Sequence, residues 1–168
     1  MGRDKSRLRL GGRTLLAHIR QAARASGLPQ RIIRGDVVAR CGPLGGIHTA
    51  LMTSRSDGVV FLACDMPFVS VGLLRMLLRR AKYHQSGLFV EADGRAGFPF
   101  ILFCKTARPC VERQLAKRAL SVQQLARALG AQALPLPARR AREVFNVNSP
   151  EDLARARDLW RSRGAGKG

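Results

Sequence analysis

Residues 59–69 read VVFLACDMPFV. The apolar run over residues 59–64 ends at a single aspartate, Asp65, and Met-Pro-Phe follows at once. The run follows Gly58 and is rich in β-branched and aromatic residues, which is typical of a strand covered on both faces, as in a parallel sheet. In open parallel sheets, ligands bind beyond the carboxyl ends of the strands. The pattern therefore predicts a buried strand over residues 58–65 that delivers the Asp65 carboxylate to a ligand-binding crevice.

Two interpretations of Asp65 are open at this point. Mg²⁺ binds through one or two protein carboxylates and leaves its other positions to water and substrate phosphates, so Asp65 could be a metal anchor. Alternatively, Asp65 is a loop aspartate that accepts a hydrogen bond from a neighbouring backbone amide. The residue alone does not separate the two.

The rest of the chain alternates between helical and extended patterns. Ser70 is placed to cap a helix, and Ser121 with Gln124 forms a capping box. The helices are expected over residues 14–25, 47–54, 71–82, 109–119, 121–130 and 150–161, and further strands over residues 87–93, 98–104 and 131–137. This alternation predicts an α/β sandwich with a mainly parallel sheet, in one domain over residues 1–160 followed by a disordered tail over residues 161–168.

The formal net charge is +19, from 30 Lys and Arg against 11 Asp and Glu. Such an excess can indicate nucleic-acid binding, because clustered basic residues neutralise phosphates. Here the arginines are spread over helix faces, with one Trp and one Tyr in the chain and no zinc-finger or RNP-like signature. The pattern favours basic solvent faces together with an anionic small-molecule ligand over nucleic acid.

Several classes of protein are disfavoured by the composition. No apolar run is long enough to span a membrane, and the first residues are charged, without a secretory signal. The cysteines lack CxxC spacing and are interpreted as reduced thiols of a cytoplasmic protein: Cys41, Cys64, Cys104 and Cys110. No heptad pattern is present, and we expect a monomer.

Other candidate residues have equally ordinary explanations when taken singly. The stretch CGPLGGI, residues 41–47, could bring backbone amides close to an anion or could be a plain turn. Lys5 could be an exposed terminal lysine, and Asn146 and Asn148 could be turn or cap residues, with Asn148 or Ser149 placed as the cap of the following helix. No nucleophilic Ser-His-Asp or Cys-His arrangement can be argued, and the histidines are assigned no chemistry.

The order of four motifs is more specific than any one of them. MGRDKSRLRLGGRTLLAHI, CGPLGGI, FLACDMPFV and FNVNSPEDLARA follow one another from Met1 to about Leu159. Together they resemble the molybdenum cofactor guanylyltransferase family. The resemblance implies a three-layer α/β/α sandwich of the nucleotide-diphospho-sugar transferase (Rossmann-like) type. It also implies transfer of GMP from GTP to molybdenum-molybdopterin, with Mg²⁺ and release of pyrophosphate.

The resemblance also implies roles for individual residues. Lys5 matches the lysine that closes the phosphate-binding loop of the family and would serve in catalysis and nucleotide binding. Asp65 matches the Mg²⁺ ligand, and Asp36 an aspartate used in nucleotide binding. Asn146 and Asn148 match asparagines near the pterin side of the crevice. The nucleotide-binding turn of the family is matched by Gly42, Pro43, Leu44 and Gly45.

Two departures from the family pattern are expected to matter. Members begin with a strand and a loop of the pattern Leu-Ala-Gly-Gly-x-Ser-x-Arg-Met-Gly, whereas this chain begins at the Met-Gly of that loop. We therefore expect the chain to lack the first strand and most of the phosphate loop, and hypothesise that an internal methionine was taken for the initiator. A second strand is expected to be missing around SGLPQRII, residues 26–33.

Alternative functions remain open on the sequence alone. A related transferase could use CTP or a sugar phosphate, because the sequence around the base pocket is expected to be missing and the choice of base cannot be read from the rest. An inactive basic binding protein of the same fold is the alternative from another class. The resemblance further implies a molybdoenzyme or its chaperone as a transient partner.

Overall fold

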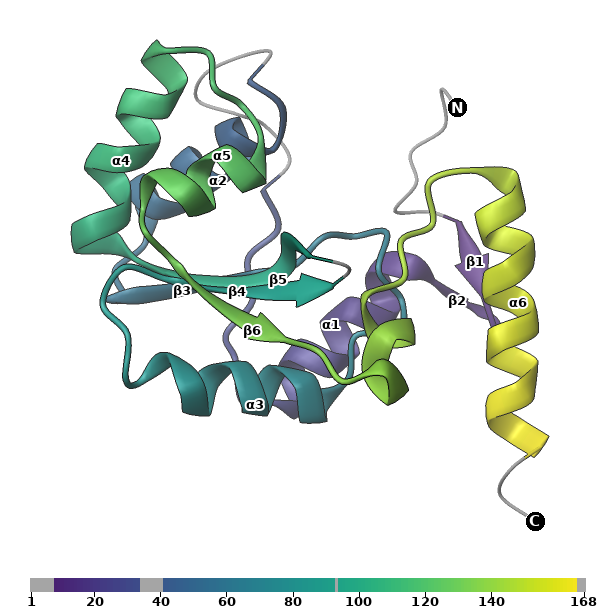
Figure 1. Cartoon of the computed structure of the whole chain (residues 1–168). Coiled ribbons are helices and arrows are strands. Elements are labelled where there is room, and N and C mark those ends of the chain that lie inside the picture. Colours follow the sequence, from purple (N-terminus) through teal and green to yellow (C-terminus); the bar gives the residue numbers. More distant parts are fainter. Residues whose placement is uncertain (1–7, 34–40, 93, 166–168) are drawn as a thin grey trace. The chain divides into compact units, whose positions relative to one another are not determined.

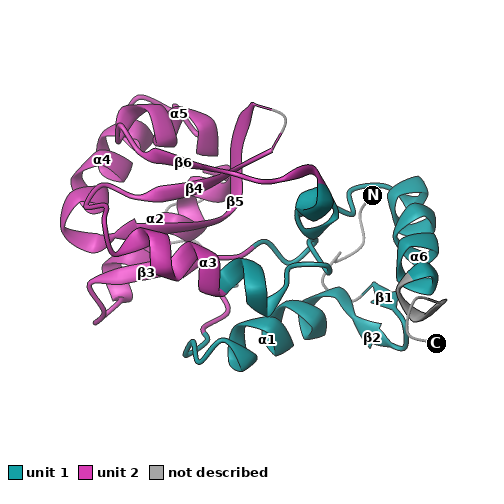
Figure 2. Cartoon of the chain, turned by 60° about the horizontal axis from the view of Figure 1, so that its bottom comes forward, with its two compact units in different colours: residues 1–30, 63–74, 139–168 teal, residues 31–62, 75–138 magenta. Residues whose placement is uncertain are grey.

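The structure is a computed structural model that describes residues 8–33, 41–92 and 94–165 (Figure 1). Its contacts divide the chain into two compact units (Figure 2). Unit 1 comprises Met1–Gln30, Ala63–Leu74 and Arg139–Gly168, and unit 2 comprises Arg31–Leu62 and Arg75–Ala138. Each unit is therefore assembled from stretches that are distant in the sequence.

Unit 2 contains a four-stranded sheet within the part of the chain that is described. Its order is β3-β5-β4-β6, formed by Gly58–Phe61, Arg95–Phe103, Leu88–Ala92 and Gln132–Pro135. An aromatic row crosses three of these strands, because Phe61 stacks on Phe100 at 5.0 Å between ring centroids and Phe100 stacks on Phe89 at 4.5 Å. These cross-strand pairs stabilise β5 between its two neighbours.

The α/β class is confirmed, but the sheet is mixed where the sequence predicts it to be mainly parallel. β5 pairs antiparallel with both β3 and β4, and only β4 and β6 form a parallel pair. The physical reason is the turn containing Gly94, whose φ is +70°. A tight turn can only join antiparallel strands, and a parallel connection needs a long crossover. β3, β4 and β6 still point in one direction.

Three helices of unit 2 pack on one face of this sheet (Figure 1). They are α2 (Gly42–Thr53), α4 (Cys104–Ala116) and α5 (Val122–Ala128). The second half of α3 (Val71–Ala81) belongs to this unit and lies on the opposite face (Figure 1). The core between the sheet and the three helices consists of Leu44, Ile47, Leu51, Phe61, Phe89, Phe100, Leu102, Cys104, Ala107, Cys110, Val111, Leu125 and Ala126.

Unit 1 has a small core of its own. Its elements are β1 (Arg9–Leu10), β2 (Arg13–Thr14), α1 (Leu15–Ala25), most of the 3-10 helix η2 (Ala138–Val144) and α6 (Pro150–Ala165). The buried core residues are Leu10, Leu15, Phe68, Val147 and Ala156. His18 is buried and lies against Trp160 with 4.7 Å between ring centroids. Its Nε2 is 2.9 Å from the Leu10 carbonyl, so it is a core histidine.

The predicted capping residues are confirmed. Ser70 Oγ accepts a hydrogen bond from the Leu73 amide over 3.0 Å. Ser121 and Gln124 form the complete capping box of α5. Such caps satisfy amides that have no partner inside the helix.

The carboxyl-terminal helix differs from the expectation in length. α6 begins at Pro150 as predicted and runs to Ala165, into the segment predicted as a disordered tail. Asp158 and Arg161 form an i,i+3 pair at 3.2 Å, and Ser162 Oγ donates to the Leu159 carbonyl over 3.0 Å. These local contacts favour continuation of the helix.

Among the described residues, no helix is both long and apolar enough to cross a membrane.

Candidate functional site

Asp65 lies in a turn and not at the end of a strand. β3 ends at Phe61, so the predicted strand over residues 58–65 is wrong in its last part. Asp65 belongs to unit 1, where its backbone carbonyl accepts a hydrogen bond from the Val147 amide over 2.8 Å. The main chain leaves the sheet after Phe61 and pairs instead with the segment that precedes α6.

This hydrogen bond brings together three residues that the resemblance predicted for the site. Val147 is completely buried in the core of unit 1, whereas Asn146 and Asn148 on either side of it are exposed. In an extended segment, alternate side chains point to opposite faces, so residues two apart share a face. The buried valine thus holds the two exposed asparagines beside the turn of Asp65.

Of the two candidate caps of α6, Asn148 and Ser149, it is Ser149 that caps the helix. Ser149 Oγ accepts from the Asp152 amide over 3.1 Å, and Asp152 Oδ2 accepts from the amides of Asn148 and Ser149 over 2.9 and 3.0 Å. The Asn148 amide hydrogen bond holds the pKa of Asp152 below its ordinary range. The backbone amide of Glu151 lowers the pKa of that carboxyl in the same way. The start of α6 is therefore organised without the Asn148 side chain as its cap.

The carboxylate of Asp65 is the metal ligand that the resemblance implies. Asp65 is half-buried and its Oδ1 is inaccessible to solvent. Within residues 8–33, 41–92 and 94–165, no group of three or more His, Cys, Asp or Glu side chains comes together to hold a metal ion.

The glycine turn predicted for nucleotide binding is the first turn of a helix. α2 begins at Gly42, where the sequence predicts a start at residue 47, because Pro43 is favourable in a first helical turn. Gly42 and Pro43 are exposed, while Leu44 and Gly45 are buried. Leu44 packs in the core of unit 2, so the exposed part of this turn is Gly42 and Pro43, of which only Gly42 carries a main-chain N–H.

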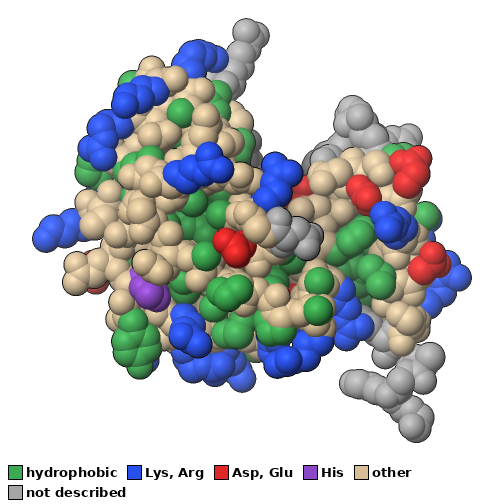
Figure 3. All heavy atoms as spheres, in the orientation of Figure 1, with side chains coloured by type: hydrophobic (Ala, Val, Ile, Leu, Met, Phe, Trp, Pro, Cys, Tyr) green, Lys and Arg blue, Asp and Glu red, His purple; other side chains and the backbone are tan. Residues whose placement is uncertain are grey.

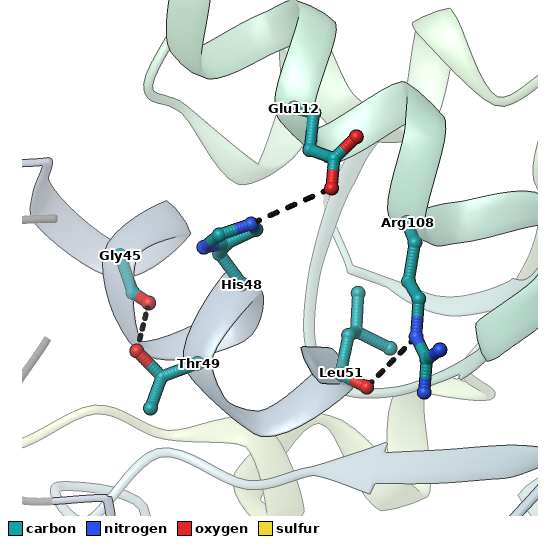
Figure 4. A network of polar contacts seen from close by, with 6 residues as sticks. All are labelled: Gly45, His48, Thr49, Leu51, Arg108 and Glu112. Carbon is teal, nitrogen blue, oxygen red and sulfur yellow. Dashed lines mark hydrogen bonds and ion pairs between the residues drawn. The ribbon is translucent and has the colours of Figure 1, made fainter. Parts of the chain in front are cut away.

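Helix α4 holds the other end of α2 (Figure 4). Arg108 of α4 donates from Nε to the Leu51 carbonyl over 2.9 Å and from Nη2 to the Ser54 carbonyl over 3.3 Å. A second contact joins His48 Nε2 to Glu112 Oε1 at 3.8 Å. Arg108 thus provides donors for carbonyls at the carboxyl end of α2, where helices leave such groups without intrahelical partners.

Two predicted site residues lie outside the described residues. These are Lys5 and Asp36. The structure therefore groups Asp65, Asn146 and Asn148 in unit 1 and places the turn beginning at Gly42 in unit 2. Sequence reasoning missed Val147 and Arg108, which act through main-chain hydrogen bonds. The one signal in the sequence for Val147 is that it is an apolar residue between two asparagines in FNVNS.

A family model described as the MobA-like NTP transferase domain matches residues 1–134. This chain belongs to that family. The resemblance drawn from the motifs is thereby confirmed, and the MobA-like chain is a nucleotidyltransferase enzyme. Membership also accounts for the order of the motifs along the sequence.

Individual proteins extend this result. The MobA-like chain is 31% identical over 176 residues to the molybdenum cofactor guanylyltransferase of Pseudomonas entomophila, covering 90% of this chain and 88% of the relative. Among solved structures, molybdopterin-guanine dinucleotide biosynthesis protein A from Archaeoglobus fulgidus aligns with a TM-score of 0.76 and 22% identity, covering 96% of this chain and 92% of that chain. The 2-C-methyl-D-erythritol 4-phosphate cytidylyltransferase of Thermus thermophilus aligns with a TM-score of 0.71 and 21% identity, over 94% and 93% of the two chains. Both structures confirm the Rossmann-like nucleotidyltransferase fold.

Proposed function

We propose that this chain transfers GMP from GTP to molybdenum-molybdopterin and releases pyrophosphate. The observation that carries the proposal is the hydrogen bond from Val147 to Asp65. Val147 lies between Asn146 and Asn148, the two asparagines that the resemblance assigns to the pterin side. The identity to a named guanylyltransferase over 90% of the chain supports the same substrate pair. Both substrates are anionic, which agrees with the net charge of +19.

The proposed division of labour follows from the chemistry of phosphoryl groups. Asp65 would hold Mg²⁺, which supplies charge stabilisation at the phosphates when bound. Lys5 would provide a cation for the phosphates, and Asp36 would contact the nucleoside. The turn of Gly42, Pro43, Leu44 and Gly45 would lie against GTP, with N–H donors from Gly42 and Leu44, because Pro43 has no N–H and the Gly45 amide donates to the Cys41 carbonyl. Nucleotidyl transfer needs mainly this positioning, because the protein supplies little covalent chemistry.

Asn146 and Asn148 are proposed to contact the pterin. Their exposed amide side chains can both donate and accept hydrogen bonds, which suits the mixed donor and acceptor edges of a pterin ring. We further propose that the chain acts as a cytoplasmic monomer and hands its product to a molybdoenzyme or a chaperone.

The decisive experiment compares Asp65→Asn with Asp57→Asn, a matched change at an exposed aspartate of unit 2. Binding of GTP with Mg²⁺ is measured by calorimetry, and pyrophosphate release is measured after addition of the molybdenum-molybdopterin acceptor. We expect Asp65→Asn to reduce kcat/KM at least about a hundredfold, since metal-ion stabilisation contributes several kcal/mol. Asp57→Asn should stay within about twofold of the parent.

Other outcomes of this experiment would change the proposal in defined ways. Equal activity of the parent and Asp65→Asn would overturn the metal role of Asp65. Binding of CTP in place of GTP would keep the reaction class and change the base. Binding of neither nucleotide, in a chain that is folded by circular dichroism, would favour the inactive basic binding protein.

A further inference from the structure

Helix α1 carries a group of arginines that the proposed function does not use. Arg13, Arg20 and Arg24, together with Ala17 and Gln21, line a surface hollow of about 450 Å³ in unit 1. The three arginines and Gln21 are exposed, and Ala17 forms a half-buried floor. We call this feature the arginine hollow.

Helix α1, which carries most of the arginine hollow, is packed and capped. The opposite side of α1 is buried through Leu15, Ile19, Ala22 and Ala23. Thr14 Oγ1 accepts from the Ala17 amide over 3.1 Å and caps the helix where it begins. Because a packed and capped helix holds its residues in fixed order, the arginines that project from it are presented on one stable surface.

Two of the guanidinium groups are oriented by neutral partners. Arg13 Nη1 donates to Gln21 Oε1 over 2.5 Å, and Arg20 Nε donates to Gln30 Oε1 over 3.3 Å. Gln30 also donates from Nε2 to the Arg20 carbonyl over 2.8 Å, which returns the segment after α1 to the helix. Amide oxygens direct a guanidinium group without neutralising it, so both arginines keep their full charge.

Among the described residues, no acidic side chain pairs with the arginines of the hollow. Across the described ranges, the ion pairs that form involve other residues, and none joins a carboxylate to Arg13, Arg20 or Arg24. Lys and Arg side chains are spread over the face seen in Figure 3, with few acidic side chains among them. An anion that bound between the three arginines would relieve their mutual repulsion.

We propose that the arginine hollow is a binding site for a compact polyphosphate anion, a ligand with two or more linked phosphate groups. Guanidinium forks match phosphate oxygens in pairs, and three of them can engage more than one phosphate. No aromatic residue lines the hollow, whereas sites for single-stranded nucleic acid commonly stack bases on aromatic rings. The charge therefore favours phosphates, and no aromatic ring among the lining residues stacks a base.

The test uses inorganic tripolyphosphate as the probe, without added metal and at two salt concentrations. The hollow variant R13Q/R20Q/R24Q keeps side chains of similar polarity and removes the three charges. We expect it to weaken tripolyphosphate binding in calorimetry at least about tenfold, because charge-assisted hydrogen bonds are lost. The lysine variant R13K/R20K/R24K should bind tripolyphosphate more weakly than the parent and more tightly than the hollow variant, since it keeps the three charges and loses the guanidinium forks.

A control with the same change in net charge separates a site from general attraction. R79Q/R80Q/K105Q alters three exposed cations in unit 2 and should weaken binding less than about threefold. Equal losses in the control and the hollow variant would overturn the proposal. Tighter binding of a single-stranded oligonucleotide that is lost in the hollow variant would also overturn it, in favour of nucleic acid.

A second readout locates the probe on the unmodified chain, even where the hollow variant does not fold. Phenylglyoxal modifies accessible arginines, and mass spectrometry resolves the modified positions. Tripolyphosphate should protect Arg13, Arg20 and Arg24 and leave Arg79 and Arg80 reactive. Protection of all five to the same degree would contradict a site at the hollow.

Discussion

The amide of Val147 donates a hydrogen bond over 2.8 Å to the carbonyl of Asp65. This bond joins the turn after β3 to the segment before α6, both in unit 1. Asn146 and Asn148 are consequently placed by the main chain and by the burial of the valine between them. The candidate site thus depends on a residue that has no functional group of its own.

Shortening that buried side chain should loosen the junction. Val147→Ala removes two methyl groups from a completely buried position and should lower the free energy of unfolding by about 2 kcal/mol. Chemical denaturation measures this change. Asn146→Ala, at the exposed neighbouring position, should change stability by less than about 0.5 kcal/mol. Equal effects of the two changes would show that Val147 does not anchor the segment.

Arg108 should contribute more to stability than the neighbouring ion pair. Arg108→Ala leaves the Leu51 and Ser54 carbonyls without their charged donor and should cost about 2 kcal/mol. Glu112→Ala removes a contact whose carboxylate is largely exposed and should cost less than about 1 kcal/mol. Urea denaturation of the two variants checks the order, and a reversed order would refute the assignment of Arg108 as the anchor of α2.

The cysteines should differ sharply in reactivity. Cys64 is exposed next to Asp65, while Cys41, Cys104 and Cys110 are buried. Burial also raises the pKa of the Cys110 thiol, which reduces its reactive thiolate. Ellman's reagent should therefore modify one thiol rapidly in the folded chain and the other three only on unfolding. Cys64→Ser should abolish the rapid phase. A rapid phase that remained in that variant would contradict the burial of the other three cysteines.

The start of α6 should be sensitive to acid. Hydrogen bonds from the Asn148 and Ser149 amides hold the pKa of Asp152 low, so the carboxylate stabilises the fold above its ordinary pKa of 3.8. This stabilisation is lost as the pH falls through the lowered value. Asp152→Ala should therefore reduce Tm by about 3 °C at neutral pH, and by progressively less as the pH falls below 3.8.

A matched change in the same helix controls for the loss of one negative charge. Asp158 pairs with Arg161 at the surface, where both side chains are well exposed. Asp158→Ala should leave Tm nearly unchanged at both pH values. If it reproduced the acid-dependent loss, the effect would belong to net charge and not to the cap.

The parts that sequence reasoning anticipated are those determined by near neighbours. The capping box at Ser121 and the cap at Ser70 depend on residues within one helical turn. The two strands that flank Gly94 were likewise signalled by an apolar run on each side of a turn. Local chemistry of this kind is written directly in the order of the residues.

The parts that it missed depend on distant partners. The insertion of β5 between β3 and β4 follows from the aromatic row centred on Phe100, which apolar runs alone do not reveal. The pairing of Val147 with Asp65 is made by backbone atoms that every residue carries. Asp65 was identified from its motif, but its position in a turn could not be read from the apolar run before it.

The division of the chain between the units has a consequence for its synthesis. All residues of unit 2 leave the ribosome before any of residues 139–168, so the four-stranded sheet can form while the nascent chain is still growing. The carbonyl of Asp65 must wait for Val147. A premature stop codon after residue 138 would therefore leave unit 2 with all its residues and unit 1 without Asn146, Val147 and Asn148.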